Sequence, residues 1–148
     1  MPLANIPTAT LVVCVALIDD RGRVLLHKRR AGGTHGGLWE FPGGKIELGE
    51  SSEAALVREI AEELGVAVSV ADLRAERESA GDIHGGVPLV LFLYSCTCWS
   101  GEPRCLEGEA IGWFTPSAAA ALAVPPLDRP FIARLPAIIA AARPAAVG

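Results

Sequence analysis

Apolar runs separated by short polar turns dominate the chain and predict a sheet-rich fold. Residues 8–18 and 87–99 are rich in aliphatic side chains, and the long apolar stretches of the second run favour a central strand covered on both faces. The polar turn at 19–22 predicts that the first run forms a hairpin with the strand that follows it. In chain order, the other strands are expected at 23–28, 39–41, 66–78 (as one or two strands) and 109–114.

The strongest helix signal lies between a glycine-rich turn and a single glycine. Residues 53–64 are good helix formers, Ser51 or Ser52 can cap their start, and Gly65 follows their end. We therefore predict a helix of about three and a half turns.

The remaining segments give weaker predictions. Pro136 is expected to kink or interrupt the last helix, because proline removes a backbone hydrogen bond. We expect a basic, glycine-rich loop at 29–37 and a second loop at 79–86. A short helix is expected at 116–122, a C-terminal helix at 128–142 and a frayed tail at 143–148. The irregular alternation of strands and helices favours an α/β fold with a mixed sheet between helices, in a single domain of residues 1–148.

The 53–64 helix carries an unusual concentration of acid. At 100° per residue, Glu59, Glu62 and Glu63 share an arc of roughly 100°. The neighbouring arc is expected to face the core and holds Val57, Ile60, Ala61 and Leu64. Three like charges so close together repel one another, so a positive partner is expected. Mg²⁺ or Mn²⁺ suits such an open carboxylate cluster, since both accept oxygen ligands and substrate phosphates.

Composition and charge narrow the possible partners. A net charge of −4 and a pI near 5.4 give no general attraction to nucleic acid polymers, whereas a nucleotide monomer stays compatible because a metal ion supplies positive charge. The longest apolar run ends well short of a membrane span, and no cleavable leader precedes it, so we expect a cytoplasmic protein without membrane contact. A monomer or a homodimer is expected.

The four cysteines contain no CxxC pair. A strand through Cys96 and Cys98 would point both side chains to one face, which leaves a zinc site open as an alternative. Buried, reduced thiols are the favoured interpretation for these two residues and for Cys14 and Cys105. His27, in the second expected strand, is interpreted as structural.

The region between Gly44 and Val66 resembles a known motif. Gly44, five residues, Glu50, seven residues and then Arg-Glu-Ile-Ala-Glu-Glu-Leu-Gly-Val match every fixed position of the Nudix box, GX5EX7REUXEEXGU. The resemblance implies an α/β/α sandwich and a loop-helix-loop that binds metal ions and a diphosphate. It implies that Glu59, Glu62 and Glu63 are metal ligands, with the Gly43 carbonyl beside them. Arg58 would orient the cluster by pairing with a carboxylate such as Glu50.

The similarity continues outside the box. Residues 37–47, GLWEFPGGKIE, and residues 107–113, EGEAIGW, are similar to the MutT branch of nucleoside triphosphate pyrophosphohydrolases. This implies that Glu107 is a further metal ligand or the general base, and that attack at the β-phosphorus gives a monophosphate and pyrophosphate. Glu40 and Phe41 would line the nucleotide site. Arg29 and Lys45 are candidates to contact the nucleotide or its phosphates, although Lys45 fits a solvated residue equally well, and residues 29–37 fit an ordinary loop.

Asp128 bears on the choice of base. The branch places a base-reading side chain here, which is asparagine in its prototype and aspartate in similar cytidine-nucleotide hydrolases. An ionised carboxylate accepts hydrogen bonds only, which suits the amine of cytosine or the N1–H and amine edge of guanine. A protonated Asp128 would also donate, provided that burial raised its pKa. Alternatively, Asp128 caps the C-terminal helix, alone or in addition.

Three functions follow from the resemblance. The first is a Mg²⁺-dependent hydrolase that removes 8-oxo-dGTP from the nucleotide pool. The second is a pyrophosphohydrolase of CTP, dCTP or modified pyrimidine triphosphates. The third is a nucleotide-binding module without catalysis, against which the complete carboxylate set argues.

Overall fold

Two β-sheets form the centre of the molecule in the computed structural model, which describes residues 9–33, 35–82 and 87–143. The larger sheet has the order β4-β1-β6-β5, and β1 and β6 are parallel while the other pairs are antiparallel. Its strands are Thr10–Leu17 (β1), Gly43–Lys45 (β4), Arg74–Asp82 (β5) and Pro88–Cys96 (β6). The smaller sheet is antiparallel, in the order β3-β2-β7, and consists of Val24–Lys28 (β2), Trp39–Glu40 (β3) and Ala110–Phe114 (β7).

The expected hairpin of the first two strands forms only at its turn. Asp19 shapes this turn by accepting hydrogen bonds from the backbone N–H groups of Arg21 and Arg23, and a single bridge joins Ile18 to Val24. Beyond the bridge the strands diverge, because β1 lies between β4 and β6 whereas β2 lies between β3 and β7. The mixed sheet expected from the sequence is therefore accompanied by a second, smaller sheet.

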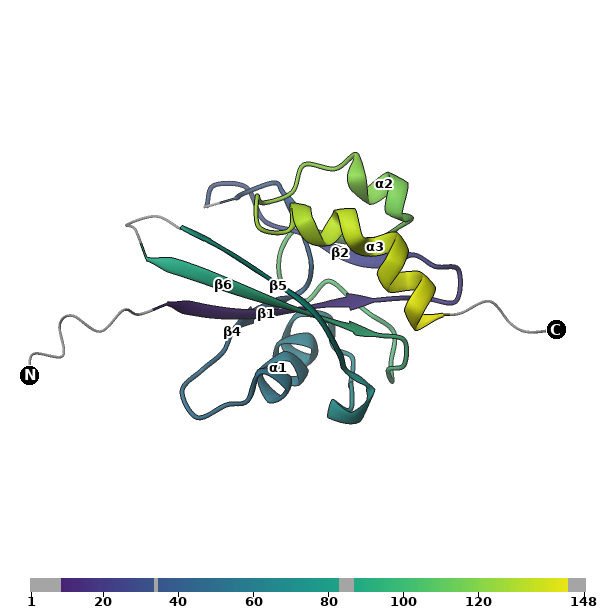
Figure 1. Cartoon of the computed structure of the whole chain (residues 1–148), viewed down its shortest axis with the longest axis horizontal. Helices are drawn as coiled ribbons and strands as arrows, with labels where there is room; N and C mark the ends of the chain where they lie inside the picture. Colours follow the sequence, from purple (N-terminus) through teal and green to yellow (C-terminus); the bar gives the residue numbers. More distant parts are fainter. Residues whose placement is uncertain (1–8, 34, 83–86, 144–148) are drawn as a thin grey trace, which may run out of the picture.

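Helices cover both faces of the larger sheet, which confirms the α/β/α arrangement (Figure 1). Helix α1, Ser52–Leu64, lies on one face, while α2, Pro116–Ala120, and α3, Arg129–Ala142, lie on the other. The predicted ends of α1 are confirmed, since the Ser51 hydroxyl accepts from the Ala54 N–H at 3.1 Å and Gly65 adopts a left-handed conformation with φ of 70°.

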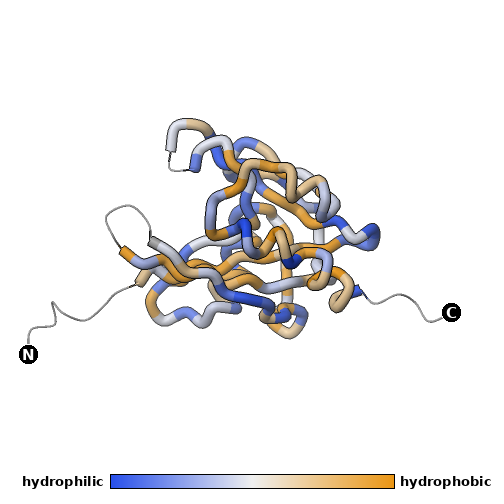
Figure 2. Tube along the Cα trace, turned by 45° about the horizontal axis from the view of Figure 1, so that its top comes forward, coloured by the Kyte–Doolittle hydropathy of each residue, from blue (hydrophilic) through white to orange (hydrophobic). Residues whose placement is uncertain are grey.

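The core is divided by the larger sheet into two clusters. Alternate residues of β1 point to opposite sides, so Val13 and Val15 pack with α1 whereas Ala16 and Ile18 pack with α3. We call these the α1-side and α3-side clusters. Figure 2 shows the apolar segments running through the central strands, with hydrophilic residues at the outer turns.

The three tryptophans are shared between the clusters. Trp99 and Trp113 stack on the α1 side, with ring centroids 5.9 Å apart and planes inclined by 20°. Trp39 packs on the α3 side, edge to face with Phe114 at 5.0 Å. Each cluster thus has its own aromatic contact.

Some expected boundaries were wrong. Of the one or two strands expected at 66–78, only 74–78 is confirmed, as part of β5: a 3-10 turn at Val70–Asp72 precedes this strand, which continues to Asp82 instead of ending before the expected loop at 79–86, because β6 supplies hydrogen-bond partners along its length. Residues 83–86, including His84, lie outside the described residues. Residues 43–45 form β4 rather than only a turn.

The C-terminal expectations also need correction. Helix α3 continues through Pro136 without interruption. Arg143, the first residue of the expected frayed tail, is anchored, because its guanidinium donates to the carbonyls of Ile18 and Thr97 at 3.1 and 3.2 Å. Residues 144–148 lie outside the described part of the chain.

The cysteines are free thiols, but only two of them are buried. Cys14 and Cys96 lie in the core, whereas Cys98 and Cys105 are exposed. Strand β6 ends at Cys96, so Cys98 does not continue its face and the expected alignment of the two side chains was wrong. Across residues 9–33, 35–82 and 87–143, no helix is long and apolar enough to cross a membrane.

Candidate active site

Glu59, Glu62 and Glu63, which we call the acidic arc of α1, lie closer to the sheet than the sequence suggested. The buried residues of the helix are Ala55, Leu56, Ile60, Glu63 and Leu64. Val57 is only partly buried and Ala61 is exposed, so the expected core-facing arc was rotated away from the true one. Glu63 therefore belongs to the buried face, while Glu62 keeps half of its side chain in solvent.

Glycines of β4 make room for these carboxylates. A Cβ atom on Gly44 would overlap the Glu59 carboxylate, and one on Gly43 would overlap the backbone of β1. The Gly43 N–H donates to Glu63 Oε2 at 3.3 Å. Two glycines without side chains at the start of β4 thus let the acidic residues of α1 face the sheet, a role for Gly44 that the sequence signals only through the Gly43-Gly44 pair.

Arg58 connects the outer carboxylates. Its guanidinium binds both carboxylate oxygens of Glu50, at 2.8 and 2.9 Å, and contacts Glu59 at 2.9 Å and Glu62 at 3.4 Å. This two-point contact lowers the pKa of Glu50 to about 2 and raises the pKa of Arg58. Arg58 also donates to the Lys45 carbonyl at 3.2 Å, which links the helix to β4.

The inner carboxylates are strongly perturbed. Burial raises the pKa of Glu63 to about 8, against the opposing effect of His27 and with a further increase from Glu59. Burial also raises the pKa of Glu59, and Arg58 opposes that shift. Two acidic groups are therefore held where their ionised forms are poorly solvated.

The segment with Glu107 returns to this cluster from far along the chain. The Arg104 N–H donates to the Leu64 carbonyl and the Leu106 N–H to the Glu63 carbonyl, both at 2.9 Å. Glu107 itself is exposed, and its negative charge contributes to the raised pKa of Glu59, after the larger effect of burial. The predicted fourth glutamate thus follows a segment bound to the end of α1, and its charge acts on Glu59.

The donor set suits a hard divalent cation. Glu59, Glu62, Glu63 and Glu107 offer carboxylate oxygens, the ligands that such ions prefer, and burial leaves Glu59 and Glu63 in need of compensating positive charge. Within the described ranges, no three His, Cys, Asp or Glu side chains are already gathered as a metal site. The chemistry of the residues fits the ion, although they do not form a preassembled shell.

On the α3 side of the larger sheet, Asp128 meets Phe41. Asp128 is 5% exposed, and its Oδ2 accepts from the Phe41 N–H at 3.2 Å. Burial raises the pKa of Asp128 to about 7, although this hydrogen bond opposes the shift. Its side chain makes no capping hydrogen bond to α3, so the capping interpretation was wrong. The carboxyl group points back to the strand that leads into the box.

The other expected nucleotide-binding residues lie on both sheets. Arg29 Nε donates to Glu40 Oε1 at 2.6 Å, and Glu40 lies on β3 directly before Phe41. Lys45 is exposed on β4. His27, beside Glu40 on β2, is a buried polar residue near the glutamates, which its position in a strand pattern did not reveal.

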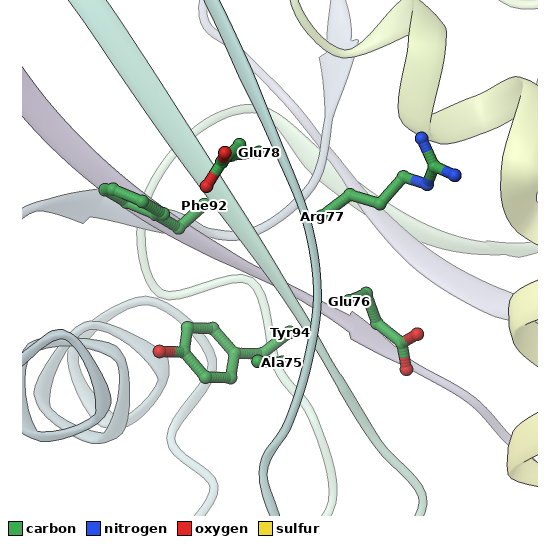
Figure 3. A pocket seen from close by; sticks show the side chains of 6 residues that line it. All are labelled: Ala75, Glu76, Arg77, Glu78, Phe92 and Tyr94. Carbon is green, nitrogen blue, oxygen red and sulfur yellow. The ribbon is translucent and has the colours of Figure 1, made fainter.

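A separate hollow of about 530 Å³ lies at the edge formed by β5 and β6. In Figure 3, Phe92, Glu78 and Tyr94 lie on one side of β5, while Arg77 and Glu76 point to the other, toward α3. The hollow contains none of the expected site residues. The Tyr94 hydroxyl is occupied by contacts with Ser52 and Glu53 at the start of α1, which points to a structural role.

Known proteins share both the sequence and the fold. The family model described as NUDIX domain matches residues 8–135. The chain is 37% identical to a CTP pyrophosphohydrolase of Escherichia coli over 135 residues, 90% of this chain and 96% of that protein. It is 35% identical to an 8-oxo-dGTP diphosphatase of the same organism over 127 residues, 84% of this chain and 95% of that protein.

Solved structures agree with this relationship. The solution structure of the Escherichia coli ORF135 protein superposes with a TM-score of 0.80 at 32% identity, covering 99% of this chain and 100% of that one. A MutT structure from work on Aliivibrio salmonicida and Vibrio cholerae gives 0.75 at 30% identity, covering 88% and 99%. With its complete box, the family match over residues 8–135 and these relatives, the chain belongs to the NUDIX family of hydrolases, in the MutT-like branch.

Proposed function

We propose that this protein cleaves nucleoside triphosphates to the monophosphate and pyrophosphate, with 8-oxo-dGTP as its main substrate. The observation that carries the choice of substrate is the buried Asp128. Burial raises its pKa to about 7, so the carboxyl group is protonated in about half of the molecules at neutral pH. A neutral carboxyl group donates and accepts at once, so it can face the O6 and N1–H of a guanine ring.

The acidic arc supplies the chemistry. Glu59, Glu62 and Glu63, with the Gly43 carbonyl, hold the divalent ion, and Glu107 acts as a further ligand or as the base that accepts a proton from water. Arg58 keeps Glu50, Glu59 and Glu62 in place through the contacts described above. We propose Mg²⁺, with Mn²⁺ as a substitute, because both prefer oxygen ligands.

Members of this family depend on divalent metal ions and act on small nucleotide substrates. When bound, the ion neutralises polyphosphate charge and makes water more acidic. Arg29 and Lys45 contact the nucleotide or its phosphates, and Glu40 and Phe41 line the base site next to Asp128. The proposed enzyme works in the cytoplasm as a monomer or homodimer, without a nucleic acid polymer or membrane as partner.

A second candidate is hydrolysis of CTP, dCTP or modified pyrimidine triphosphates. It is favoured by the 37% identity to a CTP pyrophosphohydrolase over 90% of this chain. In its ionised form, Asp128 accepts from the exocyclic amine of cytosine. The two candidates share the reaction and differ in the protonation state of one side chain.

Pyrophosphate release with Mg²⁺ tests the proposal on 8-oxo-dGTP, dGTP, CTP, dCTP, 5-methyl-dCTP and ADP-ribose, compared by kcat/KM. We expect 8-oxo-dGTP to dominate. Preference for the cytidine nucleotides would replace the main substrate with the second candidate. Absence of release from the whole panel would contradict catalysis and leave a nucleotide-binding module.

The pH dependence of KM tests the role of Asp128. For 8-oxo-dGTP, KM should rise as the pH increases through about 7, because Asp128 loses the proton that it donates. The Asp128→Asn variant keeps a donor and an acceptor without titrating, so its KM should be flat over this range. A KM for CTP that falls with increasing pH would instead indicate an ionised carboxylate.

A further inference from the structure

His27 lies between the Glu107 backbone and the Glu40 side chain. It is a β2 residue, 7% exposed, and its Nε2 lies 2.8 Å from the backbone carbonyl oxygen of Glu107. Because a carbonyl oxygen only accepts, Nε2 carries the hydrogen of this bond. The other ring nitrogen, Nδ1, is 3.8 Å from Glu40 Oε1, which is ion-pair distance rather than a hydrogen bond.

The Glu107 backbone is closely fitted to this ring. Gly108 has a φ of +83°, and a Cβ atom there would overlap His27 Nε2. One residue further on, the Glu109 N–H donates to the Lys28 carbonyl at 2.9 Å, which continues the pairing of β7 with β2. The imidazole therefore holds Glu107 where its segment leaves α1 and enters the smaller sheet.

The contacts on the two sides of Glu107 are different in kind. Toward α1, the segment is held through the Leu106 N–H and the Glu63 carbonyl. At Glu107 itself, the carbonyl accepts from the His27 ring and from the Cys105 thiol, at 3.1 Å. A thiol is a weak donor, so the imidazole supplies the stronger bond to the residue whose negative charge acts on Glu59.

We propose that His27 is a positioning residue, which fixes the backbone of Glu107 so that its carboxylate lies against the metal-binding glutamates. This inference rests on the proposed function and assigns to β2 a part in the reaction. His27 touches neither phosphate nor water in this role. It acts through Glu107, while its contact with Glu40 ties the same ring to the residue that pairs with Arg29.

Two substitutions of His27 separate the effect of its hydrogen-bond donation from the effect of its side-chain volume. His27→Leu fills the space without a donor, whereas His27→Gln keeps an amide N–H at similar reach. For 8-oxo-dGTP with saturating Mg²⁺, we expect His27→Leu to lower kcat about 10-fold with KM changed less than about 3-fold, as expected for loss of one hydrogen bond. His27→Gln should recover most of the loss.

A remote variant controls for general destabilisation. Ser95→Ala removes a part-buried hydrogen bond of another buried side chain, from Ser95 on β6 to Glu76 on β5 at 2.6 Å. Its kcat should match the wild type even where its melting temperature falls as far as that of His27→Leu. Should His27→Leu fail to fold, the kcat of His27→Gln decides, and a value below one tenth of wild type would overturn the proposal.

A double-mutant cycle tests the route through Glu107. If His27 acts by placing that carboxylate, His27→Leu should cost less than about 2-fold in a Glu107→Gln background. Full additivity would overturn the inference, as would an unchanged kcat in His27→Leu alone. If the wild type is active, failure of the His27 proposal leaves the proposed function intact. A wild type that is inactive on every nucleotide overturns both the proposed function and the role of His27.

Discussion

The two faces of the larger sheet divide the labour of the site differently. On the α1 face, Glu59, Glu62 and Glu63 come from one helix and are near in both sequence and space, while the Glu107 segment reaches that helix from far along the chain. On the α3 face, Asp128 meets Phe41 across 87 residues of chain. The proposed metal-binding glutamates of α1 are thus a local structure, whereas the positions of Glu107 and of the proposed base-reading Asp128 depend on the tertiary fold.

This difference explains how each part tolerates change. The arc on α1 depends on helix register and on a bare glycine strand, both fixed by local sequence. The contact of Asp128 depends on how α3 packs on the sheet, so its geometry can vary while the reaction is kept. The similarity to relatives named for different nucleotides agrees with this division.

The strongest test of the α1 face is Glu63→Gln, which keeps size and removes charge. We expect kcat to fall at least about 100-fold with the fold intact, because a proposed metal ligand is lost, and Glu62→Gln should behave alike. Glu53→Gln is the matched control on the same helix, since Glu53 accepts from Tyr94 instead. Near-normal pyrophosphate release by Glu62→Gln and Glu63→Gln would refute the ligand assignment.

A smaller effect is expected from Gly44→Ala. The added methyl group would overlap the Glu59 carboxylate and displace it, so we expect kcat to fall about 10-fold, of the order of one lost interaction. Gly33→Ala is the control, because a Cβ there meets nothing within 4 Å. Equal kcat values for the two variants would show that β4 does not constrain the arc.

The α3 face should show its burial in the pH dependence of stability. The pKa of Asp128 is raised from 3.8 to about 7, so its stabilising contribution is complete below about pH 4 and is lost as the pH rises through about 7. Relative to Asp128→Asn, the wild type should lose about 2 kcal/mol of unfolding free energy between pH 5 and pH 7. Denaturant titrations at both pH values measure this, and a constant difference would contradict the burial effect.

The smallest expected effect concerns the start of α1. Ser51→Ala removes the hydroxyl that accepts from Ala54, and we expect a loss of about 1 kcal/mol in unfolding free energy without a change in KM. Ser69→Ala is the matched control, because Ser69 precedes the 3-10 turn without a side-chain capping bond. Thermal or urea unfolding distinguishes them, and equal losses would mean that the cap contributes nothing.

Prediction from sequence succeeded where the signal was local. Ser51, Gly65 and the helix between them follow from capping and propensity alone. The direction of the buried face could not be predicted in the same way. The helical period placed Val57 and Ala61 in the core, because the sequence does not show that Gly43 and Gly44 of β4 lie against the acidic side of the helix. Likewise, β5 extends through 79–82 because it pairs with β6, and no local sequence pattern in 79–82 predicts this pairing.

The site shows the same limit. Matching the box located the glutamates, and the resemblance located Asp128, but the sequence did not reveal that the Asp128 carboxyl group accepts from Phe41 instead of capping α3. His27 has no motif around it, and its contact with Glu107 spans 80 residues. Long-range contacts of this kind depend on the fold as a whole, so local patterns cannot supply them.

The distribution of the tryptophans makes the two faces separately visible to spectroscopy. The stacked Trp99 and Trp113 rings can couple electronically, which gives the α1 side a near-ultraviolet circular dichroism signal of its own. Trp39 precedes Glu40 and packs on the α3 side, near the proposed base site. Replacing Trp99 and Trp113 by phenylalanine would leave the emission of Trp39 alone, so that each face of the sheet has its own optical reporter.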